Sequence, residues 1–319
     1  MFQSTLMSTP DAVTLFDVGG GQAQGSREYQ EDFYTVIRPE NFPAETQDKL
    51  AFFALYDGHG SGLVAEHASK RLHRLLAQRP EFERGDYAGA MKAVLADEDG
   101  LLLESFKHDS VEPAMSGSTA AICFINLTVG ELVVSNLGDS HVILAERDPK
   151  TECPYHIRRL TEAHKPETPS EKARIHEAGG SVETRSGVPR VGSLNMSRTL
   201  GDLQYKSPVN TVESDSDSTP RDRRMVSASS KPTHGDYVSN DPYTSRRTLK
   251  PDRRYLLAII SDGVSNNTDD GALVQHVMKL AMRGMRAGDI ARDVATNNAV
   301  LPHSDNATCI VAFLDGQSS

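Results

Sequence analysis

Short apolar runs recur along the chain, and their composition predicts β-strands. The runs are rich in β-branched or aromatic residues and are bounded by Gly, Asp or Asn, the residue types that favour turns. They cover Ala51–Tyr56, Thr119–Ile125, Leu132–Ser135, Val142–Ala145, Tyr255–Ile260 and Thr308–Leu314. Several turn signals separate the runs within residues 120–144, so we expect an antiparallel meander there rather than βαβ crossovers.

Helical periodicity occurs between these runs. After Ser61, which suits a helix N-cap, apolar side chains repeat on one helical face at Val64, Ala68, Leu72 and Leu75. Further helices are predicted over residues 86–107, weakened at Gly100, over residues 169–178, with Gly179 as the stop signal, and as a pair over residues 271–285 and 287–299. The mixture predicts an α+β fold of antiparallel sheet with helices layered outside it.

One segment departs from both patterns. Residues Ser207–Asp236 are rich in Ser, Asp, Arg and Pro and nearly lack apolar side chains. Because strand signals resume afterwards, we expect a mobile insertion and not a domain boundary. We therefore predict a single domain over residues 1–319, with its core between residues 12 and 316. The serines and the basic "RDRR" leave a regulatory or docking role open beside that of a solvated insertion with no specific task.

Composition narrows the class of protein. The 319 residues carry a formal net charge of −10 and are enough to bury a large core. The acidic balance argues against nucleic acid or an anionic membrane as a partner, and no apolar run approaches the roughly 20 residues of a membrane-spanning helix. The three cysteines, Cys123, Cys153 and Cys309, are scattered, which indicates neither a disulfide framework nor a zinc motif.

The cysteines and the first residues bear on location. The first 26 residues contain no Lys or Arg but include Asp11 and Asp17, a pattern unlike a signal or transit peptide. We expect an intracellular protein in the reducing cytoplasm or nucleus, or in the mitochondrial matrix if a presequence has been removed. A monomer is the default expectation.

Acidic side chains stand at the ends of several predicted strands. Asp57 follows "AFFALY", Asp262 follows "YLLAIIS", and Asp305 precedes "NATCIVAFL". Glu31 and Asp32 precede another β-like run. Taken singly, such an Asp is more often a turn residue or a helix cap. If the strands lie in neighbouring sheets, however, the carboxylates converge and must be protonated or neutralised by cations, and oxygen ligands alone suit Mg²⁺ or Mn²⁺ rather than Zn²⁺.

Characteristic motifs surround these residues and extend from Gly25 to Leu314, nearly the whole chain. They are "GSREYQED", "LYDGHGSG", "SGSTAAICFI", "VSNLGDSHVIL", "LTEAHKP" with "EKARIHEAGG", "VGSLNMSRTLGD", "LAIISDGV" and "SDNATCIV". In sequence and in order, these motifs resemble those of the PP2C (PPM) family of metal-dependent protein serine/threonine phosphatases. The resemblance implies a four-layer αββα sandwich in which helices flank two antiparallel β-sheets.

The resemblance also implies a metal centre. It implies two ions, Mg²⁺ or Mn²⁺, that share a bridging water, and a weaker third ion. Asp57 would bridge the two ions, and Gly58 would contribute its backbone carbonyl. The other implied ligands are Asp262 and Asp305 for the second ion, Glu31 and Asp32 directly or through water, and Asp139 in "NLGDS" for the third ion.

Two further residues are implied in the reaction. Arg27 in "SREYQED" matches the arginine that holds the substrate phosphate. The metals would lower the pKa of the bridging water, so that hydroxide attacks phosphorus in line with the departing serine or threonine oxygen. His59 is the candidate general acid for that oxygen, with ordering of water in a turn as the alternative. Histidines expected to be structural include His67, His73, His164 and His176.

The sequence departs from the family pattern at a few positions. Gln30 stands where Asn is frequent, His141 replaces a usual arginine and is expected to alter a surface salt bridge, and Ser265 and Asn266 stand where Trp-Asp is typical. The main hypothesis is an active phosphatase whose partners are phosphoprotein substrates. The departures keep open a pseudophosphatase that uses the fold as a scaffold. A two-metal phosphodiesterase or nuclease also needs clustered carboxylates, but the chain lacks a basic track for nucleic acid.

Overall fold

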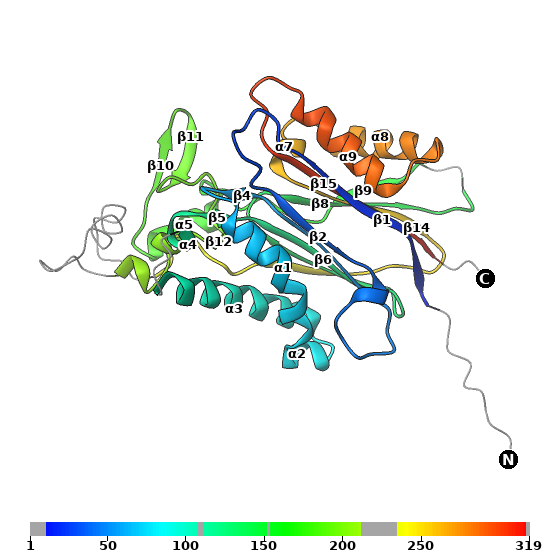
Figure 1. Ribbon diagram of the computed structural model, residues 1–319, viewed down its shortest axis with the longest axis horizontal. Coiled ribbons are helices and arrows are strands. Elements are labelled where there is room, and N and C mark those ends of the chain that lie inside the picture. The colour runs from blue at the N-terminus through cyan, green and yellow to red at the C-terminus, as the bar shows by residue number, and fades with distance from the viewer. Residues whose placement is uncertain (1–10, 108–111, 152–153, 212–234, 317–319) are drawn as a thin grey trace, which may run out of the picture.

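Two antiparallel β-sheets stack face to face, with helices on their outer faces (Figure 1). The computed structural model describes residues 11–107, 112–151, 154–211 and 235–316. The β14 sheet has the order β1 (Val13–Ala23), β15 (Ala307–Gly316), β14 (Arg254–Ile260), β8 (His141–Arg147) and β9 (His156–Arg159). The β6 sheet has the order β13 (Tyr243–Thr248), β7 (Glu131–Leu137), β6 (Ala120–Asn126), β3 (Leu50–Tyr56) and β2 (Phe33–Ile37).

The helices form the two outer layers. Helices α8 (Asp270–Met282) and α9 (Ala287–Ala299) cover the β14 sheet, and α1 (Leu63–Ala77) and α3 (Tyr87–Lys107) cover the β6 sheet (Figure 1). The predicted four-layer αββα sandwich is therefore confirmed. The shorter helices are α2 (Pro80–Glu83), α4 (Glu112–Met115), α5 (Pro169–Glu177), α7 (Asp262–Ser265) and the 3₁₀ turns Pro39–Asn41, Leu203–Tyr205 and Val209–Thr211.

The central strands are buried on both faces, which explains their unbroken apolar sequences. In β3, Phe53 and Leu55 point between the sheets, whereas Phe52 and Tyr56 point towards α1 and α3. Strand β14 alternates in the same way between the sheet interface and the α8–α9 layer. Successive strand residues face opposite sides, so a strand covered on both sides needs apolar residues at every position.

The structure confirms the six predicted strands and the predicted helices, and it adds strands outside those runs, among them β1. Its sequence contains three consecutive glycines that resemble a turn. A Cβ added to Gly19 would lie 2.5 Å from the backbone of Gly288, and one added to Gly21 would lie 2.3 Å from that of Arg292. Both contacts are with α9. The glycines thus let the helix backbone approach the strand closely, a use of glycine that local sequence does not distinguish from a turn.

Two local predictions are wrong. The N-cap of α1 is Gly62, not Ser61, and it makes no side-chain capping bond. The meander predicted over residues 120–144 is only a hairpin, because β6 and β7 pair in one sheet whereas β8 belongs to the other. The chain crosses between sheets just where Asp139 lies. This crossing places an acidic residue between the sheets at the end where β3 also stops.

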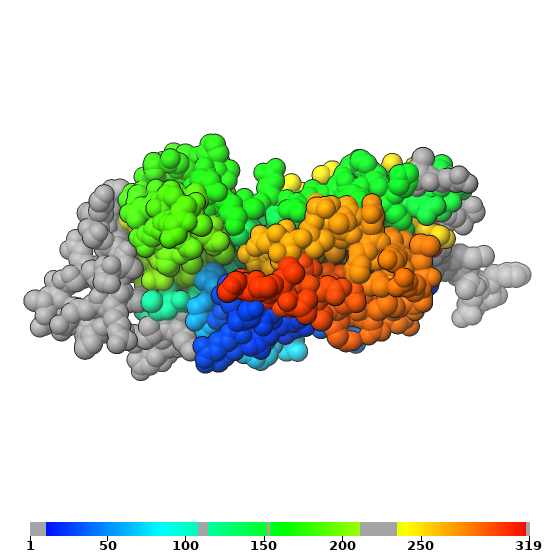
Figure 2. Space-filling model, turned by 90° about the horizontal axis from the view of Figure 1, so that it is seen from above, coloured from blue at the N-terminus to red at the C-terminus, as the bar shows by residue number. Residues whose placement is uncertain are grey.

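Small strands extend the sandwich beside this end. Strands β4 (Gly58–His59), β5 (Gly117–Ser118) and β12 (Leu200–Gly201) form a three-stranded sheet. Helix α5 and the hairpin of β10 (Val182–Arg185) and β11 (Val188–Val191) contribute to a lobe with its own apolar cluster. Seen from above, this green lobe is separated from the orange helices α8 and α9 by a hollow (Figure 2).

Other predictions concern smaller features. Cys123 and Cys309 are buried free thiols, and burial raises the pKa of both; Cys153 lies outside the described residues. Of the insertion predicted over residues 207–236, residues 212–234 also lie outside the described part. The helices of the described ranges include none that is both long and apolar enough to cross a membrane. The single-domain boundary stays a prediction.

Candidate active site

The sandwich brings the predicted carboxylates together from separate strands. Asp57 directly follows β3, and Asp262 opens α7 two residues after the end of β14. Asp305 precedes β15, whose Cys309 pairs with Ile260 of β14. The backbone N–H of Asp262 lies 3.4 Å from Asp57 Oδ2. The strand ends therefore converge at one edge of the sheet interface, as the sequence predicted.

Burial and mutual repulsion raise the pKa values of this cluster. Burial is the main cause for Asp57, whose pKa lies well above its ordinary value, with further increases from Asp32, Asp262, Asp139 and Asp305. The pKa of Asp32 is raised to about 7, mainly by burial, and that of Asp262 to about 6, by burial and then by Asp139 and Asp305. Clustered buried carboxylates of this kind are costly unless protons or cations neutralise them.

Two carboxylate oxygens in the cluster are buried without a hydrogen-bond partner. Thr308 donates to Asp32 Oδ2 at 2.7 Å, which leaves Asp32 Oδ1 buried and unpartnered. Lys165 forms an ion pair with Asp139 Oδ2, which leaves Asp139 Oδ1 also buried and without a partner. A buried anionic oxygen without a donor indicates that a positive group belongs beside it.

Arg27 and Glu31 lie at the exposed side of the cluster. The Arg27 Nη2 donates to Asp305 Oδ2 at 2.6 Å, and 57% of the arginine side chain stays exposed. Glu31 has its pKa raised by burial, against the lowering effects of His59 and Arg27. Arg27 is thus placed next to the carboxylates, and within the described part of the chain its only ion-pair partner is Asp305.

His59 forms an ion pair that the sequence did not predict. Its Nε2 lies 2.8 Å from Asp202 Oδ2, and only 1% of the Asp202 side chain is exposed. Burial lowers the pKa of His59, but the Asp202 carboxylate, followed by Asp139 and Glu31, raises it more, so the balance lies above the ordinary value. The imidazolium form is therefore stabilised beside the carboxylate cluster.

Glycines allow this close packing. A Cβ added to Gly58 would lie 2.3 Å from the carbonyl oxygen of Glu31. At Gly117, an added Cβ would lie 2.0 Å from Asp202 Oδ2 and 2.8 Å from His59 Nε2. Strands β4 and β5 pair here, so the missing side chain of Gly117 is what makes room for the pair.

The residues fit divalent metal ions in chemistry and in charge. They supply carboxylate oxygens and backbone carbonyls, the ligands that Mg²⁺ and Mn²⁺ prefer, and they include the two unpartnered oxygens. In the described ranges, no three His, Cys, Asp or Glu side chains are already arranged around one point that could hold an ion. The inference that divalent metal ions fit this site therefore rests on the types of ligand atom present and on the negative charge that the protein does not neutralise.

Three residues with a part in the site had no role assigned from the sequence. Asp202 lies in the quoted "SRTLGD", Lys165 in "LTEAHKP" and Asn306 in "SDNATCIV". Asn306 accepts from Glu31 N–H at 2.7 Å and donates to the carbonyls of Gln24 at 2.7 Å and Tyr29 at 3.0 Å. It therefore fixes the loop that carries Arg27. The only sequence signal was membership of a motif.

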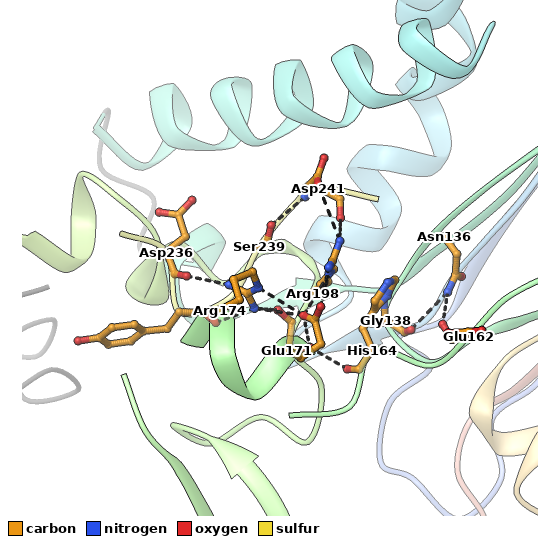
Figure 3. Close-up of polar contacts among 12 residues, drawn as sticks. Asn136, Gly138, Glu162, His164, Glu171, Arg174, Arg198, Asp236, Ser239 and Asp241 are labelled. Carbon is orange, nitrogen blue, oxygen red and sulfur yellow. Dashed lines mark hydrogen bonds and ion pairs between the residues drawn. The ribbon is translucent and has the colours of Figure 1, made fainter. Parts of the chain in front are cut away.

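Figure 3 shows a partly buried network of polar contacts around Glu171, Arg174 and Arg198. Glu171 in α5 accepts from Arg198 Nε at 3.1 Å and from Ser197 Oγ at 2.8 Å. Arg198 Nη1 also donates to the carbonyl of Asp241 at 2.6 Å, and Arg174 Nη2 donates to that of Ser197 at 2.8 Å. Burial raises the pKa of Glu171, but the bonds from Arg198 and Ser197 lower it more, to about 2. The network fastens the chain that leads into Asp202.

The structure gives the surroundings of His141, which departs from the family pattern, and of two other histidines. His141 is buried beside Thr161, with its Nδ1 3.2 Å from the hydroxyl oxygen. The expected alteration of a surface salt bridge at this position stays a prediction. Burial lowers the pKa of His141 to about 4. His164 Nδ1 accepts from Gly138 N–H at 3.1 Å, which helps to hold the loop of Asp139. His67 contacts Glu98 at 2.5 Å.

The sandwich with a carboxylate cluster at its edge defines the class of protein that the motifs indicated, and comparisons with known proteins give the same class. The family model described as protein phosphatase 2C matches residues 16–306. The chain therefore belongs to the protein phosphatase 2C family.

Individual relatives agree with this assignment. "Protein phosphatase 2C homolog 2" of Aspergillus flavus is 34% identical over 197 residues, which cover 59% of this chain and 42% of that protein. "Protein phosphatase 1E" of Mus musculus is 31% identical over 291 residues, which cover 90% of this chain and 33% of that protein. The chain thus spans less than half the length of these curated relatives.

Solved structures share the fold. The crystal structure of serine-threonine phosphatase 2C from Toxoplasma gondii superposes with a TM-score of 0.73 at 19% identity, over 96% of this chain and 99% of that one. A sex-determining protein of C. elegans superposes with a TM-score of 0.71 at 23% identity, over 94% and 65%. At these identities the likeness concerns the fold alone.

Proposed function

We propose that the protein is a Mg²⁺- or Mn²⁺-dependent phosphatase that hydrolyses phosphoserine and phosphothreonine in protein substrates. The observation that carries the proposal is the buried carboxylate cluster, with the unpartnered oxygens of Asp32 and Asp139, beside an exposed arginine and a histidine held by Asp202. Family membership and the printed names of the relatives support the same reaction.

The metal centre would be held by the residues inferred from the motifs. Asp57 and the Gly58 carbonyl would bind the two ions, with Asp262, Asp305, Glu31 and Asp32 completing their shells and Asp139 serving a third ion. When bound, divalent ions supply positive charge to the phosphate oxygens and lower the pKa of an attacking water. Glu31 and Asp305 lie at the exposed side, where substrate would enter.

Arg27 is suited to hold the substrate phosphate. Its Nη2 is engaged with Asp305, whereas Nε and Nη1 have no partner among the described residues. A guanidinium has five N–H donors in a planar fork, so these remaining donors can bind two phosphate oxygens. Asp305 would then orient the arginine while the arginine orients the phosphoryl group for in-line attack.

His59 would supply the proton for the leaving oxygen. A serine or threonine alkoxide is a strong base, so a nearby acid lowers the barrier to its departure. Asp202 holds the imidazole through Nε2 and favours its protonated form. After donating its proton to the leaving oxygen, His59 would take up another proton from water, and the Asp202 carboxylate would favour that uptake.

The activity has a direct test. Purified protein should release phosphate from a phosphothreonine peptide with Mn²⁺ or Mg²⁺, and both a chelator and Asp57→Asn should abolish the release. The departures at Gln30, His141 and Ser265 favour a second candidate, a scaffold that keeps the fold without turnover. Metal-loaded, folded protein without turnover on any phosphopeptide would decide for the scaffold.

A further inference from the structure

A pocket of about 320 Å³ lies where the outer strands of the two sheets face each other, and we call it the edge pocket. Strand β9 is the last strand of the β14 sheet, and β13 is the last strand of the β6 sheet. The floor is apolar and buried, formed by Leu144, Leu160 and Tyr255. Basic side chains surround the floor, namely His156, Arg158, Arg246, Arg247 and Lys250.

Most of this positive charge is not neutralised by the protein. Arg246 pairs with Asp86 at 2.7 Å. Arg158, Arg247 and Lys250 have no ion pair within the part of the chain that the structure describes, although the whole chain carries a net charge of −10. Among the described residues, Glu146 is the only carboxylate that lines the pocket, and its Oε1 lies 3.3 Å from Arg253 Nε.

A hydrogen bond also holds the side chain of Arg158 in one orientation. Its Nε donates to His156 Nε2 at 2.6 Å, two residues earlier on the same strand. This bond turns one edge of the guanidinium towards the strand and leaves both Nη groups for a ligand. The pocket thus combines the free donors of Arg158 with an apolar floor and three cations that have no ion pair among the described residues.

Cations on edge strands also serve to prevent sheets from pairing with other chains. To prevent such pairing, charged side chains need only lie along an edge strand, and they can be of either sign. They need not gather around one point. Here exposed cations from both sheets surround one open pocket, and an anion that enters it reduces their mutual repulsion. The convergence, not the mere presence of charge, points to a ligand.

We infer that the edge pocket binds a phosphate group carried by a phosphorylated segment of the substrate protein, a second phosphate beside the one that is hydrolysed. This inference rests on the proposed function, since it concerns the same substrates. A phosphate dianion matches the guanidinium donors of Arg158 and Arg247, and Lys250 adds a third positive charge. A volume of about 320 Å³ accommodates a phosphorylated side chain with its backbone outside.

Strand β8 gives the spacing between the two phosphates. It begins at His141, two residues after Asp139 of the active site, and reaches Glu146 at the edge pocket. At about 3.3 Å per residue, the stretch from Asp139 to Glu146 measures roughly 20 Å. An extended peptide spans this distance in about six to eight residues. We therefore expect the second phosphate at that separation from the target residue.

The first test compares phosphopeptides that share a target phosphothreonine. One carries no second phosphate, and the others carry one three or seven residues away on either side. The wild-type protein should show a KM about 10-fold lower for a seven-residue spacing than for the single phosphate, with kcat unchanged. Arg158→Ala and Arg247→Ala should remove this preference and leave the singly phosphorylated peptide unaffected. Arg283→Ala, an exposed site outside the pocket with the same charge change, should retain it.

A binding measurement separates failure of the edge pocket from failure of the proposed reaction. The Asp57→Asn protein should bind a peptide that carries only the docking phosphate, and R247A in that background should weaken binding about 10-fold. Binding without turnover of any peptide would overturn the reaction and retain the pocket. Equal KM values at all spacings, equal losses in Arg283→Ala, or equal binding of a peptide with Glu in place of the docking phosphate would overturn the pocket.

Discussion

Asp202 holds His59 by a hydrogen-bonded ion pair of 2.8 Å across 143 residues of sequence. Asp202 has a left-handed backbone conformation, with φ 50° and ψ 37°, which is uncommon for a residue other than glycine. Its Oδ2 accepts a second bond from Thr199 Oγ1 at 2.7 Å. The carboxylate is therefore fixed by its own strand connection, and His59 is oriented by a group that is itself held in place.

This relationship predicts how Asp202→Asn and His59→Gln act on different substrates. If His59 protonates the leaving oxygen, both changes should lower kcat on a phosphothreonine peptide by about 100-fold. Both should leave kcat on p-nitrophenyl phosphate within about threefold, because nitrophenolate departs without a proton. Steady-state kinetics on the two substrates measures the difference. Equal losses on both would show that the pair only supports the structure, and would remove His59 as the acid.

Gly117 provides a second test of the same geometry. Gly117→Ala would place a Cβ 2.0 Å from Asp202 Oδ2, so the pair must separate. We expect kcat on the phosphothreonine peptide to fall at least 10-fold, with the peptide's KM little changed. The matched control is Gly100→Ala in α3, where an added Cβ has no neighbour within 4 Å. That control should keep full activity and gain about 0.5–1 kcal/mol of stability. Full activity in Gly117→Ala would contradict the assignment.

The carboxylate cluster should make the free energy of unfolding of the metal-free protein depend on pH. Asp32, with a pKa of about 7, and Asp57, whose pKa is also raised by burial, bind protons more tightly in the folded state than in the unfolded state. Stability is therefore lost as pH rises through the folded-state values. In chelator, the free energy of unfolding should fall as pH rises towards the folded-state pKa of Asp32, about 7, and Mn²⁺ should remove this fall. His141, whose pKa is lowered to about 4, acts in the opposite direction, because it adds stability as pH rises from about 4 to its ordinary value of 6.5.

The same cluster predicts that Asp57→Asn stabilises the metal-free protein. The change removes one buried charge, and each unit of raised pKa corresponds to about 1.4 kcal/mol at pH 8. Urea unfolding in chelator should show a gain on the order of 1 kcal/mol or more. Glu45→Gln, an exposed site with the same charge change, should show little effect. Equal effects of the two changes would contradict the proposed cost of the cluster.

Some strands could be predicted from their own residues alone, because their burial determines their sequence pattern. Strand β14 could be predicted because both of its faces are buried, which requires apolar residues throughout. Strand β1 could not, because its Gly19 and Gly21 lie against the backbone of α9, more than 260 residues away along the chain. The placement of β8 in the second sheet could not be predicted either, since a turn signal does not tell which sheet the next strand joins.

The residues of the candidate site also fall into two groups, those that the sequence indicates and those that only the tertiary structure reveals. Asp57 and Asp262 stand at strand ends, where sequence pattern and motif agree, and the fold brings them together. Asp202, Asn306 and Lys165 act through partners that only the tertiary structure specifies. Asn306, for example, satisfies the carbonyls of a loop almost 280 residues earlier, for which the sequence contains no periodic signal.

The network at Glu171 leads to a prediction with the opposite pH dependence. Its pKa of about 2 lies below the ordinary value of 4.5, so the carboxylate contributes stability above pH 4.5 that is lost as pH falls towards 2. Because only 3% of Glu171 is exposed, this contribution is about 2–3 kcal/mol. Glu171→Gln should therefore lower the free energy of unfolding by about that amount at pH 7.

The difference between wild type and Glu171→Gln should shrink by more than half at pH 3, where wild-type Glu171 begins to lose its charge. Urea unfolding at both pH values measures it, and taking the difference cancels the contributions of all other groups. Glu177→Gln, exposed in the same helix, serves as the control and should change stability by less than about 0.5 kcal/mol. A loss in Glu171→Gln that is the same at pH 7 and pH 3 would mean that packing, and not the ion pairs with Arg198 and Arg174, carries the effect.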